Sequence, residues 1–167
     1  MDLIFGIMFL LFLIPTSYYF YHFAAPYAGL SEERIKNVLE LAGDMKGKKV
    51  VDLGSGDGRV VIAFAKKGAE AHGYEINPLL VWRSRRTIIR AGLQDHAIIH
   101  WRSFWSADFR QYDLIHCFCI NFMMGRLERK LKKEFSKKGR IISVYFEFPH
   151  LKQNDQKGDV RSYEVSR

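Results

Sequence analysis

A run of glycines between two apolar segments constrains the fold of this chain more than any other feature. The segment VVDLGSGDGRVVIAFA spans residues 50–65 and contains Gly54, Gly56 and Gly58. The apolar residues before the glycines predict a short strand buried on both faces, and those after them predict a helix that packs back onto this strand. Because the turn has few side chains, a ligand can approach its backbone, and the helix directs N–H groups and a positive dipole end toward that ligand. We therefore expect a strand–turn–helix unit that binds a nucleotide or a nucleoside.

The spacing of the glycines limits the type of nucleotide. A phosphate-binding P-loop needs Lys-Ser or Lys-Thr after its last glycine, and neither dipeptide follows here. A dinucleotide-binding turn reads G-x-G-x-x-G, whereas this chain has Asp52-x-Gly54-x-Gly56-x-Gly58, with a second acid, Asp57, inside the turn. These carboxylates would repel an anionic ligand and accept a cationic one. The pattern resembles motif I of class I S-adenosylmethionine (SAM) methyltransferases, whose cofactor carries a sulfonium and an ammonium group and no phosphate.

A second acidic position follows the next candidate strand, residues 69–74. Glu75 lies 17 residues after Gly58, where a carboxylate can accept both ribose hydroxyls of a nucleoside. Asn77 and Pro78 then begin a helix, with Asn77 as the N-cap and Pro78 at the first helical position. Together with the glycine turn, this arrangement predicts that Glu75 binds the nucleoside part of the cofactor.

Three further segments narrow the resemblance to one family. They are GYEINPLLVWRSR at residues 73–85, SFW at 103–105 and FEFPH at 146–150. Together with the glycine turn they resemble the membrane-anchored protein lysine methyltransferases that include the ATP synthase c-subunit and adenine nucleotide translocase lysine methyltransferases, from about Pro26 to His150. The resemblance implies SAM as the cofactor. The predicted cofactor-binding residues are Asp52, Gly54, Ser55, Gly56, Asp57, Gly58, Glu75, Asn77, Ser103 and Phe104.

Two segments depart from the pattern of that family. Ser103 stands where the family tends to have an acid that contacts adenine, and residues 121–124 only partly follow its Pro-Gln-Met-Met pattern. A lysine acceptor must be neutral, and a narrow apolar channel lowers the pKa of its amine by desolvation. The candidates for this channel follow the fourth and fifth predicted strands and are Asn121, Phe122, Glu147, Phe148 and Pro149. Asn121 and Phe122 are the predicted catalytic residues, with the side-chain carbonyl of Asn121 orienting the amine.

Alternating apolar segments predict the rest of the fold. Further strands are expected at residues 97–101, 112–119 and 140–148, and helices at 32–42, 79–91 and 123–135. This repetition indicates an α/β protein with the Rossmann-like class I methyltransferase fold, in which a mostly parallel sheet has helices on both faces and binds ligands at the carboxyl ends of its strands. Only residues 159–165 offer one more strand, so the C-terminal hairpin of the usual seven-stranded sheet is predicted to be reduced.

The first 25 residues predict a membrane anchor. No Asp, Glu, Lys or Arg occurs from Leu3 to Ala25, and as one transmembrane helix this span would cross roughly 30 Å. A cleaved signal peptide is the alternative, but the N-terminus carries Asp2 and no basic residue. Because all basic residues lie C-terminal to the span, we expect a single-pass membrane protein with its catalytic domain in the cytoplasm. The predicted organisation is an anchor (1–25), a linker and covering helix (26–47) and a SAM-binding methyltransferase domain (48–167).

The positive net charge of the chain suggests an anionic partner. The net charge is +8 and the pI is near 9.5, which favours anionic partners. The basic run within residues 126–140 is either a solvated helix face or a surface for an anionic membrane, and nucleic acid is the less favoured partner. Cys117 and Cys119 fit a buried strand, and no C-x-x-C motif or His pair supports a metal, so no metal site is predicted.

These patterns favour a SAM-dependent protein lysine N-methyltransferase that acts on a membrane protein. One alternative is a methyltransferase for RNA or for a lipid-like small molecule. Another is a membrane-tethered module that binds SAM without catalysis. A nicotinamide-dependent oxidoreductase is the least favoured, because the glycine spacing departs from the dinucleotide pattern.

Overall fold

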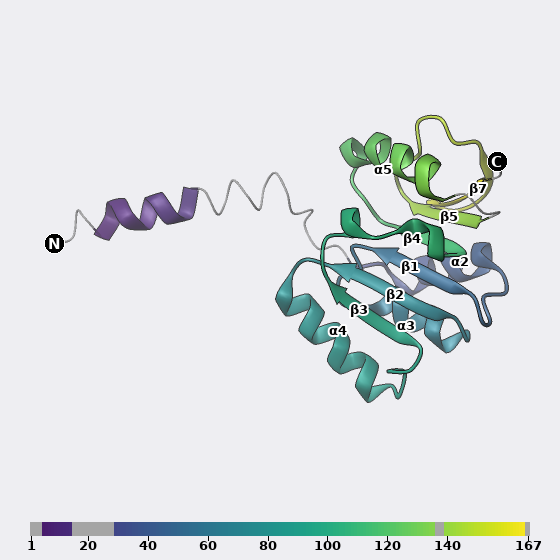
Figure 1. Ribbon diagram of the computed structural model, residues 1–167, viewed down its shortest axis with the longest axis horizontal. Coiled ribbons are helices and arrows are strands. Elements are labelled where there is room, and N and C mark those ends of the chain that lie inside the picture. The colour runs from purple at the N-terminus through teal and green to yellow at the C-terminus, as the bar shows by residue number, and fades with distance from the viewer. Residues whose placement is uncertain (1–4, 15–28, 136–138, 166–167) are drawn as a thin grey trace.

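Seven strands form one sheet within the residues described by the computed structural model, which are 5–14, 29–135 and 139–165 (Figure 1). The strands are β1 (Lys49–Leu53), β2 (Glu70–Glu75), β3 (Ala97–Trp101), β4 (Leu114–Cys117), β5 (Gly139–Val144), β6 (Gln153–Lys157) and β7 (Val160–Val165). Their order across the sheet is β3-β2-β1-β4-β5-β7-β6. The pairs among β1 to β5 are parallel, and β7 is antiparallel to both neighbours. The order reverses between β1 and β4, and the carboxyl ends of such a strand pair flank the ligand crevice of open α/β sheets.

Polar caps fix where two of the helices begin. The helices in the body of the protein are α2 (Glu32–Ala42), α3 (Arg59–Lys66), α4 (Pro78–Arg90) and α5 (Asn121–Glu134), with the short 3-10 helices η1 (Phe104–Ser106) and η2 (Phe109–Gln111). Ser31 Oγ accepts the Arg34 N–H at 3.3 Å, and Asn77 Oδ1 accepts the Leu79 N–H at 3.0 Å. The N-cap predicted at Asn77 is therefore confirmed, and Ser31 caps α2 in the same way.

Two hydrophobic layers enclose the sheet. Helices α2, α3 and α4 pack on one face, and α5 packs on the other with η2. Val50 of β1 faces the first layer and the next residue, Val51, faces the second, as the two-residue period of a strand requires. The predicted α/β fold, with a mostly parallel sheet and helices on both faces, is confirmed. Burial on both faces explains why apolar residues stand next to each other in β1 and β4, as Val50 with Val51 and Leu114 with Ile115.

Aromatic rings cover β2 and β3 on the face of the sheet that α5 occupies. His72 Nδ1 lies 2.9 Å from His100 Nε2, Tyr74 stacks on His100, and Tyr112 meets His72 edge-on. Burial lowers the pKa of His100, with help from nearby His72 and two arginines. Burial also raises the pKa of the Tyr112 phenol. His100 and Tyr112 are therefore uncharged at neutral pH and extend the core over this part of the sheet.

The C-terminal hairpin is complete, so the prediction of a reduced hairpin is wrong. β6 and β7 pair antiparallel, with a shift of register between Gln153 and Asp155. In β7, Val160 and Tyr163 are buried, whereas every residue of β6 is exposed. Because β6 reads QNDQK, it lacks the apolar alternation by which a sequence reveals a strand.

The predicted membrane anchor is described only in part. Residues 5–14 form a helix. Within the described ranges, no helix combines the length and the apolar character needed to cross a membrane. The rest of the predicted anchor, residues 1–4 and 15–25, lies outside the described residues.

Packing of α5 on the sheet should contribute strongly to stability. Leu127 is fully buried in this layer, so we expect Leu127→Ala to lower the free energy of unfolding by about 2–5 kcal/mol, measured by urea denaturation. Arg129→Ala, at an exposed position of the same helix, should change it by less than about 0.5 kcal/mol. Equal losses in the two variants would show that α5 does not act through this packing.

Candidate functional site

The glycine turn lies at the carboxyl end of β1 in a backbone conformation that favours glycine. The φ angle is 80° at Gly54, 54° at Gly56 and 81° at Gly58. Gly54 is exposed, and no atom of the described residues lies within 4 Å of the position that its Cβ would take. At Gly58 a Cβ would lie 2.8 Å from the Cβ of Ser84 in α4. The turn is therefore open at Gly54 and closed against α4 at Gly58.

Backbone N–H groups of the turn bond mainly within the protein. The Gly54 and Ser55 N–H groups both donate to the Tyr74 carbonyl oxygen at the end of β2, at 2.9 and 3.0 Å. The Gly58 N–H donates to the Ser55 carbonyl oxygen at 2.9 Å. The buried Ser55 side chain lies against Gly73 of β2. These hydrogen bonds hold the turn on β2.

Glu75 joins the turn to the start of α4. Its Oε2 atom accepts the Gly56 N–H at 2.9 Å, and its Oε1 atom accepts the N–H groups of Ile76 and Asn77 at 2.8 Å each. The side chain is buried. A carboxylate offers about four acceptor positions, so these three bonds leave about one for a ligand.

Asp52 lies under the turn and is paired with a histidine that the sequence did not single out. Its Oδ1 atom is 2.7 Å from Nδ1 of His116, and both side chains are buried. The two residues lie side by side in the parallel pairing of β1 with β4. Asp52 therefore links the two strands that flank the ligand crevice, and only the strand register reveals its partner.

Asp57 is held by Arg59, a second residue that the sequence interpretation missed. The Arg59 Nη2 atom lies 2.7 Å from Asp57 Oδ2, and Nε lies 3.0 Å from Oδ1. The same guanidinium donates through Nη1 to the Leu30 carbonyl oxygen at 2.6 Å. Part of the negative charge expected to attract a cationic ligand is thus balanced within the protein, and the turn is tied to the segment before α2.

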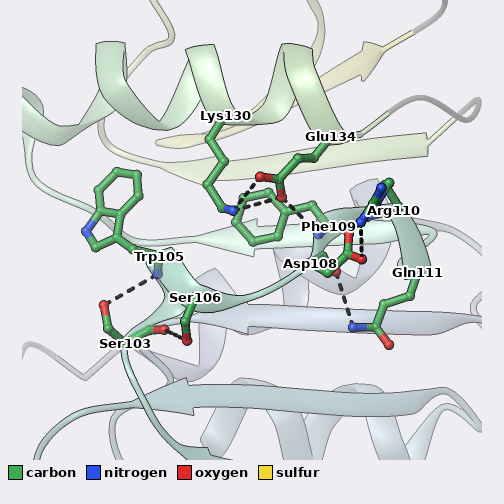
Figure 2. Close-up of polar contacts among 9 residues, drawn as sticks. All are labelled: Ser103, Trp105, Ser106, Asp108, Phe109, Arg110, Gln111, Lys130 and Glu134. Carbon is green, nitrogen blue, oxygen red and sulfur yellow. Dashed lines mark hydrogen bonds and ion pairs between the residues drawn. The ribbon is translucent and has the colours of Figure 1, made fainter.

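Ser103 and Phe104 follow β3 in a hydrogen-bonded turn. Figure 2 shows the bonds of Ser103. Ser103 Oγ accepts the Trp105 N–H at 3.4 Å, and the Ser103 carbonyl oxygen accepts the Ser106 hydroxyl at 2.8 Å. The Phe104 ring lies 4.7 Å from that of Trp105. Because β2 and β3 are adjacent and parallel, Ser103 lies at the same edge of the sheet as Glu75. Ser103, at the position where the family resemblance implies an acid, caps η1.

Helix α5 fixes the connection between β3 and β4, as Figure 2 shows. Lys130 Nζ lies 2.7 and 2.8 Å from the two carboxylate oxygens of Glu134 and 4.7 Å from the centre of the Phe109 ring. Glu134 also accepts the Phe109 N–H at 3.3 Å. Nearer the start of the helix, the Arg126 guanidinium lies 4.2 Å over the Trp105 ring. The helix that begins with Asn121 is therefore attached to the segment that carries Ser103.

The predicted catalytic residues Asn121 and Phe122 are the first two residues of α5. Both are exposed, Phe122 by 75%. Because β1 and β4 are adjacent and parallel, the start of α5 lies at the same edge as the glycine turn. An exposed apolar ring beside a polar amide suits an acceptor with an apolar stem and a polar end.

The residues after β5 do not all lie on the predicted channel. Phe148 is 4% exposed and its ring packs edge-on against Tyr163 at 5.1 Å. Its assignment to the channel is therefore wrong, because the ring fills the core beside β7. Glu147 pairs with Arg161 at 3.0 Å.

Glu128 is a buried carboxylate that the sequence interpretation also missed. Its Oε2 atom accepts the His150 N–H at 3.0 Å, and its Oε1 atom lies 2.5 Å from Lys132 Nζ. The residue thus joins α5 to the segment after β5. Glu128 lies in the basic run within residues 126–140, which the sequence alone suggests is a solvated helix face. Lys132, four residues later, is the one local signal in the sequence of this ion pair.

A hollow of about 560 Å³ lies at the opposite edge of the sheet, where β1, β4 and β5 begin. Charged residues of both signs line it, among them Lys48, Asp113, Arg140 and Glu164. None of the predicted site residues contributes to this lining. Since open α/β sheets bind ligands at the carboxyl ends of their strands, the glycine-turn edge is the candidate site.

The strand order, the glycine turn and the carboxylate at the end of β2 define a class I methyltransferase fold. A solved structure of an RNA methyltransferase from Salinibacter ruber, in complex with S-adenosyl-L-homocysteine, matches it with a TM-score of 0.76. The two proteins are 27% identical, and the match covers 83% of this chain and 94% of that chain.

The chain belongs to the ANTKMT methyltransferase domain family, which matches residues 52–155. The ATP synthase c-subunit lysine N-methyltransferase of Homo sapiens is 42% identical over 125 residues, which are 75% of this chain and 53% of the relative. The adenine nucleotide translocase lysine N-methyltransferase of Mus musculus is 38% identical over 125 residues, which are 74% of this chain and 54% of the relative. The family resemblance is confirmed. The chain spans about half the length of these curated relatives.

Gly73→Ala should loosen the glycine turn. A Cβ at this position would lie 2.6 Å from both Cβ and Oγ of Ser55 and 2.8 Å from Cδ1 of Ile99. Overpacking of this kind destabilises a protein by about 1–3 kcal/mol. We expect a loss of that size in the free energy of unfolding, together with faster hydrogen exchange at the Gly54 and Ser55 amides.

Gly125→Ala is the matched control for this variant. No atom of the described residues lies within 4 Å of the added Cβ, and Gly125 lies inside α5. Since alanine is the better helix former, the control should gain about 0.5–1 kcal/mol. Unchanged hydrogen exchange at Gly54 in the Gly73→Ala protein would contradict the proposed contact between β2 and the turn.

Proposed function

We propose that this chain is a SAM-dependent protein lysine N-methyltransferase that acts on a membrane protein. The observation that carries the proposal is the hydrogen bond between Glu75 and Gly56. It joins a buried carboxylate, at the position where α/β folds hold a ribose, to a turn whose backbone is open at Gly54. The names of the two curated relatives support lysine as the methyl acceptor.

The residues at this edge fit SAM better than a phosphate-bearing cofactor. When bound, SAM supplies a methyl group attached to a positively charged sulfur. Glu75 retains about one acceptor position for a ribose hydroxyl, and Gly54 lets the ligand approach the backbone. Asp52 and Glu75 are both buried at this edge, where a phosphate would be repelled. Ser103 and Phe104 would lie on the adenine side.

The acceptor side needs to align and desolvate an amine more than it needs a strong acid or base. The side-chain carbonyl of Asn121 would accept a hydrogen bond from the amine and orient it. The exposed Phe122 ring would pack on the aliphatic stem of the lysine and exclude water. Loss of water disfavours the charged amine, so it lowers the pKa of the lysine and favours the neutral, nucleophilic form.

Two observations support a membrane setting for the substrate. The curated relatives are named for the ATP synthase c-subunit and for the adenine nucleotide translocase. In the helix of residues 5–14, Phe5, Phe9 and Leu11 are 63–70% exposed, which suits a lipid environment better than water. A single-pass anchor with a cytoplasmic catalytic domain stays a prediction.

RNA methylation is the second candidate function. Its specific support is the Salinibacter ruber RNA methyltransferase, of which the match covers 94%. The positive net charge of the chain is compatible with this substrate as well. The chemical nature of the labelled acceptor separates the two functions.

Labelled SAM should transfer its methyl group to a membrane protein. We expect the full chain, incubated with labelled SAM and membranes from its own cell, to label a protein on lysine, identified by mass spectrometry. Label in RNA with none in protein would refute the lysine assignment and favour the second function. Binding of SAM with no formation of S-adenosylhomocysteine would instead favour a non-catalytic module.

Two variants connect this assay to the site. Glu75→Gln should weaken SAM binding by about tenfold to a hundredfold, because a hydrogen bond to a charged group contributes about 1.5–3 kcal/mol. Glu70→Gln, at the opposite end of β2, is the matched control and should bind SAM as the unaltered chain does. Calorimetric titration measures both affinities.

Asn121→Ala tests the acceptor side separately. Misalignment of an acceptor can lower turnover by about a hundredfold, so we expect a fall of about 10- to 100-fold in kcat with the affinity for SAM unchanged. Arg129→Ala, exposed on the same helix, should retain normal turnover. An unchanged kcat in the Asn121→Ala protein would remove this residue from the mechanism.

A further inference from the structure

The outer face of α4 exposes large apolar side chains to solvent. Helix α4 lies along β3 at one end of the sheet (Figure 1). Val81, Ser84 and Ile88 are its buried residues and mark the face toward the sheet. Since successive helical residues are about 100° apart, Leu79, Trp82 and Ile89 lie on the outer half of the helix. They are 67%, 55% and 63% exposed.

The same face is strongly basic. Helix α4 contains four arginines and no acidic residue, and Arg83, Arg86 and Arg90 lie on its outer half. The Arg86 guanidinium lies 4.7 Å over the Trp82 ring. Arg85 is different, because it donates to the Ile99 carbonyl oxygen at 2.7 Å and so points to the sheet. We call Leu79, Trp82, Arg83, Arg86, Ile89 and Arg90 the α4 face.

We infer that the α4 face docks onto a membrane surface that contains anionic lipids. A surface of aliphatic and tryptophan side chains can enter the boundary between the headgroups and the acyl chains of a membrane. Arginines on the same face would lie at the level of the lipid phosphates, and each basic residue near an anionic surface adds to the attraction. Burial of Leu79, Trp82 and Ile89 in lipid would remove their exposed area from water.

The other basic helix is less suited to this role. In α5, Lys130 pairs with Glu134 and Lys132 pairs with Glu128. Part of the positive charge of α5 is thus balanced within the helix, whereas α4 has no acidic residue. A nucleic acid would use the arginines of the α4 face, but it offers no apolar phase for Leu79 and Ile89.

Docking through α4 would place the candidate site beside the bilayer. The helix begins three residues after Glu75, whose carboxylate accepts the Asn77 N–H at 2.8 Å. Only the role of this docking, which is to hold the site near a membrane-protein acceptor, rests on the proposed function. Lipid binding itself requires neither SAM nor an acceptor.

Tryptophan fluorescence can test the docking with the full chain. We would bind the chain, without SAM, to phosphatidylcholine vesicles that contain phosphatidylglycerol and a lipid brominated close to its headgroup. Bromine quenches a tryptophan that enters the interface. Because Trp101 is also 61% exposed, the two tryptophan variants are compared in a chain that carries Trp101→Phe. We expect quenching in this reference chain, loss of most of it on Trp82→Phe, and its retention on Trp105→Phe, since Trp105 packs under Arg126 of α5.

A pair of charge-reversal variants supplies the matched comparison. One double variant, Arg83→Glu/Arg90→Glu, alters α4, and the other, Arg129→Glu/Lys133→Glu, alters exposed positions of α5. Both double variants change the net charge by the same amount. The α4 variant should weaken docking by at least about 30-fold, since two basic contacts are lost and two acids are repelled by the anionic surface. The α5 variant should leave it unchanged.

Several results would overturn the inference. They are an absence of quenching in the reference chain, full quenching on Trp82→Phe in that chain, and an equal loss in the α5 variant. Loss of RNA binding in the α4 variant with unchanged quenching would show that the face binds nucleic acid instead. A chain that docks but does not methylate refutes the proposed function alone, and a chain that methylates without quenching refutes the docking alone.

Discussion

Hydrogen bonds between the end of β2 and the glycine turn are the interaction on which the rest of the site depends. The Tyr74 carbonyl oxygen holds the first two residues of the turn, and the Glu75 carboxylate holds Gly56. The same carboxylate accepts the N–H groups of two residues that precede α4. One buried side chain therefore sets the position of both the turn and the helix. Its burial is tolerable because these donors satisfy its charge.

The second organising feature is the attachment of α5 to the connection between β3 and β4. Arg126 covers Trp105, and Lys130 with Glu134 holds Phe109. The proposed acceptor side begins with α5, and the proposed adenine side lies in the segment that α5 holds. A displacement of this helix would therefore move both sides of the candidate site together. In the class of reaction proposed here, alignment is the main contribution of the protein.

Local signals made much of the fold predictable from the sequence. The glycine spacing, the acid at the end of β2 and the cap at Asn77 each depend on a few neighbouring residues, and the family resemblance rests on short segments as well. His116 could not be found in this way, because its pairing with Asp52 arises from the register of β1 with β4. The burial of Phe148 in the core is not predictable from the sequence, because position along the chain does not show which way a ring packs. The strand β6 was missed because its polar sequence has no periodic apolar signal.

That polar edge strand also limits how copies of the protein can associate. An exposed strand edge offers unpaired backbone groups to other chains, and flat apolar edges promote aggregation. At the outer edge of this sheet, β6 carries polar side chains throughout and an irregular register between Gln153 and Asp155. Both features disfavour the addition of a further strand from another molecule. At high local concentration on a membrane, they would help to keep neighbouring copies from joining edge to edge into a continuous sheet.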